Sequence, residues 1–305
     1  MNLRAEMAPF KTVSVLYLAF AFRISGLYDS LAHKGARDMT LFQLLIVALI
    51  QGVTEFLPVS SSGHLILLPA LTGTPDQGLA IDVAVHVGTL LAVVLYFWRD
   101  VRIAAHGVTR LARGKVDTQG AFLALCLIVA TLPAVIVGFA IKITGLDEAM
   151  RSAAVIGWTM LVFGLVLYWA DRTGDTERTS DRWTLRDAGM MGLAQCLALI
   201  PGTSRSGITI TAARKLGYAR EDAAKLAMLM SIPVILASGA ILSLDVIGQA
   251  NWALMRDASI AAAFAFVAAL GALVLMMRLL RSISFTPYVI YRVILGIGLL
   301  IWAYT

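Results

Sequence analysis

Hydrophobic positions dominate the chain in long runs that few polar residues interrupt. A membrane-spanning helix needs about 20 apolar residues, because it crosses a hydrocarbon core of about 30 Å at about 1.5 Å per residue. Six runs meet or nearly meet this length, at residues 79–98, 121–141, 152–170, 226–244, 258–277 and 287–303. The pattern therefore predicts an all-α polytopic membrane protein.

Two further apolar stretches are broken at their centres by polar residues, glycine and proline. Residues 41–71 are interrupted at 58–64, and residues 188–213 are interrupted at 201–207. A non-helical backbone cannot face lipid, since its N–H and C=O groups would lack partners, but it is tolerated where it is buried or lines a wet cavity. Each stretch therefore predicts a re-entrant hairpin of two short helices.

Basic residues set the expected orientation in the membrane. They gather in segments 99–115, 172–186, 214–225 and 278–281, which we interpret as cytoplasmic loops, whereas 142–151 and 245–257 are poor in them. Because loops rich in Lys and Arg stay in the cytoplasm, the second group is expected outside. The first hairpin then enters from outside and the second from the cytoplasm, and each is followed by three spanning helices.

The spacing of polar residues agrees with an inverted repeat. Gln51 precedes Gly63 by the same interval as Gln195 precedes Gly207, and each pair brackets a proline and a serine-rich turn. The prediction is a single membrane domain at 39–305, made of two inverted-topology repeats at about 39–170 and about 186–305. Such repeats place their site where the broken helices meet, so the two polar centres are expected to converge.

Residues 1–38 are predicted to be an N-terminal extension outside this domain. The apolar run at 13–22 is too short for a span, and no small-residue cleavage site stands out. An extra helix, an interfacial helix and an artefact of start-site choice remain open, and Met39 is an alternative start.

Composition narrows the function classes. Of the 305 residues 59% are hydrophobic and 14% are charged, and the net charge is +6. Soluble domains have about 45–50% and 25%, so a disordered chain, a soluble enzyme and a nucleic-acid binder are poor interpretations. The positive charge is attributed to cytoplasmic loops. Cys126 and Cys196 lie in apolar runs, with neither metal-ligand spacing nor a disulfide framework.

Glu55 is the first candidate for chemistry. Ionisable groups inside a membrane are costly, and Glu55 lies in an otherwise apolar run. Gln51 precedes it by one helical turn, so both side chains share a face. The alternative is a purely structural role, in which Glu55 accepts hydrogen bonds from hydroxyl groups between helices.

Hydroxyls and an imidazole follow Glu55 closely, at Ser60, Ser61, Ser62 and His64, with Gly63 between them. A hydroxyl beside a base is what nucleophilic attack requires. His64 is alternatively the nucleophile itself or the acid that protonates a leaving oxygen. A serine run that only caps a short helix is the competing interpretation.

Arg205 marks the second polar centre. A guanidinium binds phosphate oxygens through two parallel hydrogen bonds, and backbone N–H groups of a glycine-containing turn before a helix attract anions. A structural pair with Glu55 is the alternative. The neighbouring candidates for binding the substrate are Gly202, Ser204, Ser206, Gly207 and Thr209.

Three other polar residues lie in predicted spans and are less persuasive. Asp82 and His86 share one helical face, where they could line the cavity, although Asp82 is also close to the expected membrane surface. Arg292 is expected to snorkel or to pair between helices.

Together these groups suit phosphoryl transfer, in which positioning and charge stabilisation do most of the catalysis. A single buried carboxylate could recruit Mg²⁺ or Ca²⁺ through the substrate's phosphates. A transporter or flippase for an anionic lipid is the main alternative, and a structural protein with buried polar groups is a third. The Ser/His pair beside Glu55 favours the phosphatase, because a carrier needs no nucleophile.

The two interrupted segments resemble the undecaprenyl pyrophosphate phosphatase family of the bacitracin-resistance type. The signatures are QGVTEFLPVSSSGH at 51–64 and PGTSRSG at 201–207, and the similarity runs from about Met39 to the C-terminus. The resemblance implies hydrolysis of undecaprenyl pyrophosphate to undecaprenyl phosphate at the outer face of the bacterial cytoplasmic membrane. That reaction recycles the lipid carrier for peptidoglycan and confers bacitracin resistance. A divalent cation, Mg²⁺ or Ca²⁺, a fold of two inverted repeats and a homodimer are also implied.

The resemblance assigns roles residue by residue. Glu55 would be the essential carboxylate and the cation ligand, without help from a second acid, since Gln51 occupies a position that is Glu or Gln in the family. Ser61 and His64 would be the nucleophile and its partner, in either order. The pyrophosphate would be held by Arg205 with Ser204, Ser206 and Thr209, while Ser62 replaces a threonine of some relatives and keeps the hydroxyl.

Overall fold

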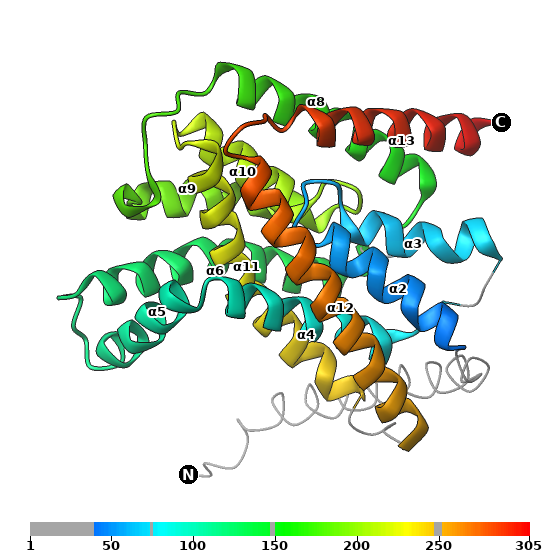
Figure 1. The fold of residues 1–305 in the computed structure, drawn as a ribbon, viewed down its shortest axis with the longest axis horizontal. Helices are drawn as coiled ribbons and strands as arrows, with labels where there is room; N and C mark the ends of the chain where they lie inside the picture. Colours follow the sequence, from blue (N-terminus) through cyan, green and yellow to red (C-terminus); the bar gives the residue numbers. More distant parts are fainter. Residues whose placement is uncertain (1–39, 74–75, 147–149, 247–251) are drawn as a thin grey trace, which may run out of the picture. The chain divides into compact units, whose positions relative to one another are not determined.

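The computed structural model describes residues 40–73, 76–146, 150–246 and 252–305. The predictions for residues 1–38 and for Met39 lie outside this part of the chain, as do portions of the two expected external loops. The described helices (Figure 1) are α2 Leu41–Thr54, α3 Ser61–Thr72, α4 Leu79–Tyr96, α5 Trp98–Leu111, α6 Gln119–Thr144, α8 Ala153–Thr173, α9 Leu185–Gln195, α10 Arg205–Lys215, α11 Arg220–Val246, α12 Trp252–Leu279 and α13 Thr286–Tyr304, with 3-10 turns η1 Ser180–Arg182 and η2 Cys196–Leu199.

The six predicted spans are confirmed as helices. Within the described residues, α4, α6, α8, α11, α12 and α13 are long and apolar enough to cross a membrane. The largest shifts of a boundary are at the starts of α11 and α12, which begin at Arg220 rather than at 226 and at Trp252 rather than at 258. Glu221 and Asp222 occupy the first turn of α11, where carboxylates are favoured by the positive end of the helix dipole.

Segment 99–115 is not the loop that its charges suggested, since most of it forms α5. Ala104 and Gly107 are buried on one face, while Arg102 and His106 are exposed on the other. The buried face lies against the start of α6, where a Cβ atom on Gly107 would come within 2.0 Å of the Gly120 carbonyl oxygen. The loop prediction was wrong because it weighed charge and overlooked the spacing of small residues.

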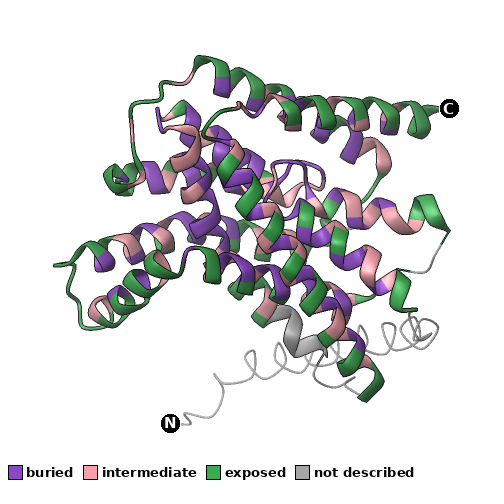
Figure 2. Cartoon of the chain, in the orientation of Figure 1, coloured by how far each residue is buried: buried purple, intermediate pink, exposed green. Residues whose placement is uncertain are grey.

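Both interrupted stretches are helical pairs joined by non-helical turns, as predicted. The first turn separates α2 from α3, and the second separates α9 and η2 from α10. Most of the turn residues are buried, and Figure 2 shows buried residues gathered near the centre of the bundle. Burial lets other chain segments form hydrogen bonds with the backbone N–H and C=O groups that have no helical partner in the turns.

The two turns end in the same way. Ser60 and Ser204 both adopt a left-handed backbone, with φ of 74° and 72°. Each is the N-cap of the following helix, and its hydroxyl accepts from the N–H of Gly63 at 3.4 Å or of Gly207 at 3.1 Å. A serine oxygen that accepts such a bond satisfies one of the free donors at a helix start.

Helices from the two halves of the sequence interleave. α12 packs against both α2 and α4, and α6 packs against α9. α8 and α13 lie side by side along their lengths (Figure 1). Each hairpin is therefore flanked by a long helix from the other half.

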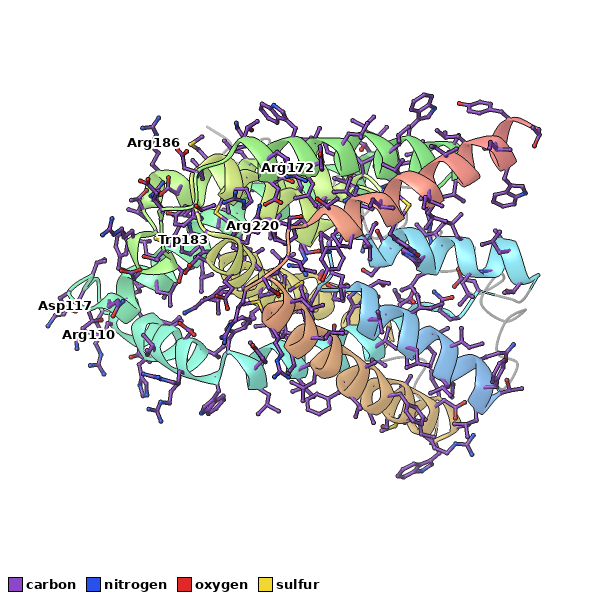
Figure 3. All side chains as sticks on the ribbon, turned by 45° about the horizontal axis from the view of Figure 1, so that its top comes forward. Arg110, Asp117, Arg172, Trp183, Arg186 and Arg220 are labelled. Atoms are coloured by element: carbon purple, nitrogen blue, oxygen red, sulfur yellow. The ribbon has the colours of Figure 1, made fainter. Side chains whose placement is uncertain are left out.

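Asp171 anchors one polar end of the bundle. Its side chain, 1% exposed, accepts from Arg214 Nε at 3.0 Å and from Arg220 Nε at 2.8 Å. Arg214, expected among loop charges, is instead fully buried at the end of α10. Figure 3 shows Arg220 on the same side of the view as Arg172 and Arg186. The pair Arg110–Asp117 lies on that side too, at the turn from α5 to α6.

Asp187 caps α9 at the same end. Its Oδ2 accepts from the hydroxyl groups of Thr184 and Tyr218, each at 2.8 Å, and from Arg178 Nη2 at 2.5 Å. Burial opposes ionisation of this carboxyl group, but the three hydrogen bonds outweigh burial and hold its pKa below the ordinary value.

Candidate active site

The two hairpin turns bring Glu55 and Arg205 into direct contact. Glu55 ends α2, Arg205 opens α10, and they are 150 positions apart in sequence. Glu55 Oε1 accepts from Arg205 Nη2 at 3.0 Å, and their side chains are 7% and 14% exposed. The two polar centres therefore meet, as the sequence predicts.

The second oxygen of Glu55 faces the first hairpin. Oε2 accepts from the Ser61 hydroxyl at 2.7 Å and from Gln51 Nε2 at 2.8 Å. Since the Ser61 hydroxyl donates its hydrogen to the carboxylate, the lone pairs of its oxygen stay available for attack. Among the described residues, the other amide atom, Gln51 Oε1, is buried without a hydrogen-bond partner.

His64 is held from two sides. Its Nδ1 lies 2.7 Å from the Ser60 carbonyl oxygen, which only accepts, so Nδ1 carries a proton. Its Nε2 then accepts from the Tyr291 hydroxyl at 2.5 Å, and the two rings stack with centroids 5.7 Å apart. Sequence reasoning missed Tyr291; the signal that could have found it is its place beside Arg292 in an apolar helix.

Several hydroxyls that the sequence singled out make bonds within the turns. Ser206 donates to the Leu57 carbonyl oxygen at 2.9 Å, and Thr209 donates to the Arg205 carbonyl oxygen at 2.8 Å. Both are buried. Ser60 and Ser204 are the caps described above, Gly202 has a positive φ in the second turn, Gly207 lies in the first turn of α10, and Ser62 is exposed. In the structure these residues support the turns that place Ser61 and Arg205.

Arg292 connects the hairpins without a carboxylate partner among the described residues. It is fully buried, so snorkelling is excluded. Its guanidinium donates to Pro58 O at 3.3 Å in the first turn and to Gly202 O at 3.1 Å and Thr203 O at 2.9 Å in the second. Two further bonds reach carbonyl oxygens of α8, at Thr159 and Met160. One side chain thus ties both turns to a spanning helix.

His86 also lies near this site, although the sequence analysis ranked it as a weaker candidate. Its Nε2 lies 3.9 Å from Glu55 Oε2, and its side chain is 38% exposed. Asp82 is turned aside, since its Oδ1 accepts from Gln77 Nε2 at 2.9 Å.

The donor set fits a hard divalent cation only in part. The Glu55 carboxylate, the unpartnered Gln51 amide oxygen and the Ser61 hydroxyl are oxygen ligands of the kind that Mg²⁺ and Ca²⁺ prefer. The described residues contain no group of three or more His, Cys, Asp or Glu side chains placed to hold a metal. A cation here would therefore need further oxygens, from water or from a substrate's phosphates, to complete its shell.

Comparison with known proteins gives one consistent result. Residues 44–298 match the family model described as Bacitracin resistance protein BacA. The chain is 76% identical to an undecaprenyl-diphosphatase of Roseobacter denitrificans over 267 residues, which cover 88% of this chain and 100% of the relative. Proteins of the same name from Ruegeria pomeroyi and Alcanivorax borkumensis are 65% and 48% identical, over 88% and 87% of this chain and 100% and 99% of their own lengths.

Proposed function

The chain belongs to the bacitracin resistance protein BacA family, and from this premise we propose that it hydrolyses undecaprenyl pyrophosphate to undecaprenyl phosphate and inorganic phosphate. The observation that carries the proposal is the joint contact of Glu55 with Ser61 and Arg205. A nucleophile, its base and an anion-binding guanidinium are thereby held in one buried place. The substrate is taken from the relatives, which are named undecaprenyl-diphosphatase.

Ser61 is the nucleophile that this geometry favours. Glu55 Oε2 accepts the hydroxyl proton as Ser61 Oγ attacks the terminal phosphorus, and the bond from that phosphorus to the bridging oxygen breaks. Undecaprenyl phosphate leaves, and Ser61 carries the phosphoryl group. Water then attacks this phosphorus, the bond to Oγ breaks, and Oγ takes back the proton that Glu55 holds. Inorganic phosphate departs with the protons of the water.

The other residues bind and orient the diphosphate. Arg205 turns its guanidinium from Glu55 toward the phosphate oxygens, and the N-terminus of α10 adds its partial positive charge. His64, fixed by Ser60 and Tyr291, keeps its imidazole beside the first turn. A divalent cation, Mg²⁺ or Ca²⁺, held by Glu55 would neutralise phosphate charge when bound.

The proposed architecture is a single domain at 39–305 with two inverted repeats, about 39–170 and 186–305, and two re-entrant hairpins. Two features support this architecture. The serine cap occurs in both halves, and a long helix of each half packs against the hairpin of the other, α12 against α2 and α6 against α9. The extension at 1–38 is proposed to lie outside this domain.

The proposed location is the bacterial cytoplasmic membrane, with the catalytic site facing the periplasm. The basic end around Arg172, Arg186 and Arg220 would face the cytoplasm by the positive-inside rule. The product would return the lipid carrier to peptidoglycan synthesis, and the activity would confer bacitracin resistance. A homodimer is proposed from the family resemblance.

The test is release of phosphate from a long-chain prenyl pyrophosphate by the purified protein in detergent, with Mg²⁺ and then with EDTA. We expect cation-dependent release that Glu55→Ala and Arg205→Ala each abolish. Glu221→Ala and Arg281→Ala break an exposed ion pair of the same chemistry and serve as matched controls, expected to be active. Well-folded wild-type protein that releases no phosphate would contradict the proposal and favour a lipid carrier.

A further inference from the structure

His86 is the polar side chain near the site that the mechanism above does not use. It projects from α4, and its Nε2 faces Glu55 Oε2 across 3.9 Å, too far for a hydrogen bond. Within the described residues Nε2 makes no hydrogen bond, whereas the corresponding atom of His64 is bonded to Tyr291. The imidazole is partly exposed, so a small ligand can reach it.

The other ring nitrogen determines what Nε2 offers. Nδ1 of His86 lies 2.7 Å from the Asp82 carbonyl oxygen, and since a carbonyl only accepts, Nδ1 must carry the proton. In the neutral ring Nε2 then presents a lone pair toward the carboxylate of Glu55. Two electron-rich atoms that face each other favour a positive ion between them. Histidines that bind metals characteristically donate their other N–H to a carbonyl or carboxylate in this way.

We propose that His86 Nε2 and Glu55 Oε2 are two ligands of one divalent cation, an inference that rests on the cation of the proposed function. A metal bonded to both atoms at about 2.1 Å keeps them at most about 4.2 Å apart. The observed 3.9 Å lies within that limit. The Arg205 bond uses Oε1, so the cation would bind the other oxygen of the carboxylate, the one to which Ser61 and Gln51 also donate.

A nitrogen ligand changes which cation the site prefers. Ca²⁺ takes oxygen ligands almost exclusively, whereas Mn²⁺ accepts carboxylate oxygen and also ranks on the series of metals that bind nitrogen donors. The site therefore binds Mn²⁺ more tightly than Ca²⁺. Phosphate oxygens and water complete the shell.

The test measures Mn²⁺ binding directly, in purified protein in detergent without substrate. Electron paramagnetic resonance gives the affinity, and electron spin-echo modulation reports a directly bound nitrogen. We expect a histidine nitrogen coupling in the wild type that His86→Gln removes, with Mn²⁺ binding at least about tenfold weaker. His106→Gln, at an exposed position of α5, is the matched control and keeps both signals.

A second variant covers the case in which His86→Gln does not fold. The chain has four histidines, so His33→Gln, His64→Gln and His106→Gln together leave His86 as the sole histidine. The nitrogen coupling should persist there. Its absence from the wild type or from this triple variant, or its survival in folded His86→Gln, would overturn the assignment.

These readings are independent of phosphate release. Nitrogen coupling in a protein that hydrolyses no pyrophosphate would support the His86 ligand and contradict the proposed function. Hydrolysis by a protein without nitrogen coupling would support the proposed function and contradict the His86 ligand.

Discussion

The two oxygens of Glu55 have different partners, and this division organises the site at the scale of single residues. Oε1 accepts from Arg205 of the second hairpin, while Oε2 accepts from Ser61 and Gln51 of the first. Loss of either partner therefore leaves the carboxylate in place with a different defect. Removal of Ser61 takes away the proposed nucleophile, and removal of Arg205 takes away the proposed anchor for phosphate.

Ser61→Ala should lower kcat for pyrophosphate hydrolysis by at least about 10³-fold, because no other hydroxyl donates to Glu55 among the described residues. Ser259→Ala is the control, since that hydroxyl is exposed and bonds only its own helix. Phosphate release by both variants decides the matter. A Ser61→Ala protein with wild-type turnover would transfer the nucleophile role to His64 or water.

Arg292→Lys should destabilise the folded protein by about 3 kcal/mol. A lysine ammonium cannot donate hydrogen bonds to carbonyl oxygens of two turns and a helix at the same time, as the guanidinium does. Thermal unfolding in detergent measures the change. Arg256→Lys, at an exposed site, should leave the midpoint unchanged. Equal midpoints for the two variants would show that the turns hold together without this guanidinium.

At the scale of elements, the same serine-capped turn occurs twice. In the second turn Gly202 occupies a position where a larger side chain would not fit. Gly202 has φ of +88°, and a Cβ atom there would lie 2.1 Å from Thr159 Oγ1. That hydroxyl already donates to Pro201 O at 2.6 Å, so it is not free to move aside. The close contact places the second hairpin directly against α8.

Gly202→Ala should therefore lower the free energy of unfolding by much more than backbone strain alone would. Gly73 is the comparison, because it also has positive φ but has no atom within 4 Å of an added Cβ. Gly73→Ala should destabilise by about 1 kcal/mol, the usual cost of alanine in this conformation. Gly202→Ala should exceed it several-fold and abolish phosphate release. Similar unfolding midpoints for both variants would refute the packing argument.

The cap of α9 should make stability depend on acidity. The pKa of Asp187 is lowered in the folded protein from its ordinary 3.8, so its ionised form contributes stability above that pH. The contribution is lost as pH falls below 3.8 toward the folded-state value. Asp187→Asn should be less stable at neutral pH and lose less stability between pH 5 and 3. Unfolding midpoints with parallel slopes for variant and wild type would contradict this account.

The sequence predicted elements better than contacts. Hydropathy located the six spans because lipid selects for continuous apolar length, and proline with glycine located both breaks. Helix α5 was missed because its buried face consists of small residues such as Ala104 and Gly107. The pairing of Tyr291 with His64, and of His86 with Glu55, depends on packing between distant helices, which spacing along one chain does not encode.

At the scale of the described bundle, each half of the sequence supplies one charge of the central pair. The non-helical turns leave backbone groups without helical partners, and lipid could not satisfy them, so burial among the longer helices is needed. Arg292 and the interleaved packing of α2, α6, α9 and α12 achieve this. The halves are therefore expected to fold together rather than as separate units.

The proposed orientation can be measured on whole cells. In a background of Cys126→Ala and Cys196→Ala, single cysteines are introduced by Thr176→Cys, in the exposed loop at the basic end, or by Ala253→Cys, exposed in the first turn of α12. A membrane-impermeant thiol reagent should label Ala253→Cys in intact cells and Thr176→Cys only after lysis. The opposite pattern would invert the protein in the membrane.

The ion pair between Glu55 and Arg205 also accounts for how the proposed site would stay free of bulk lipids. A phosphodiester headgroup carries one negative charge, no more than the carboxylate that already contacts Arg205 at 3.0 Å, so an ordinary phospholipid gains little by replacing it. A diphosphate brings more charge and more oxygens, and it can displace Glu55 while freeing that carboxylate to accept a proton. In the proposed site the resting pair would thus select for the substrate, because abundant membrane lipids would leave the pair intact and a scarce diphosphate would break it.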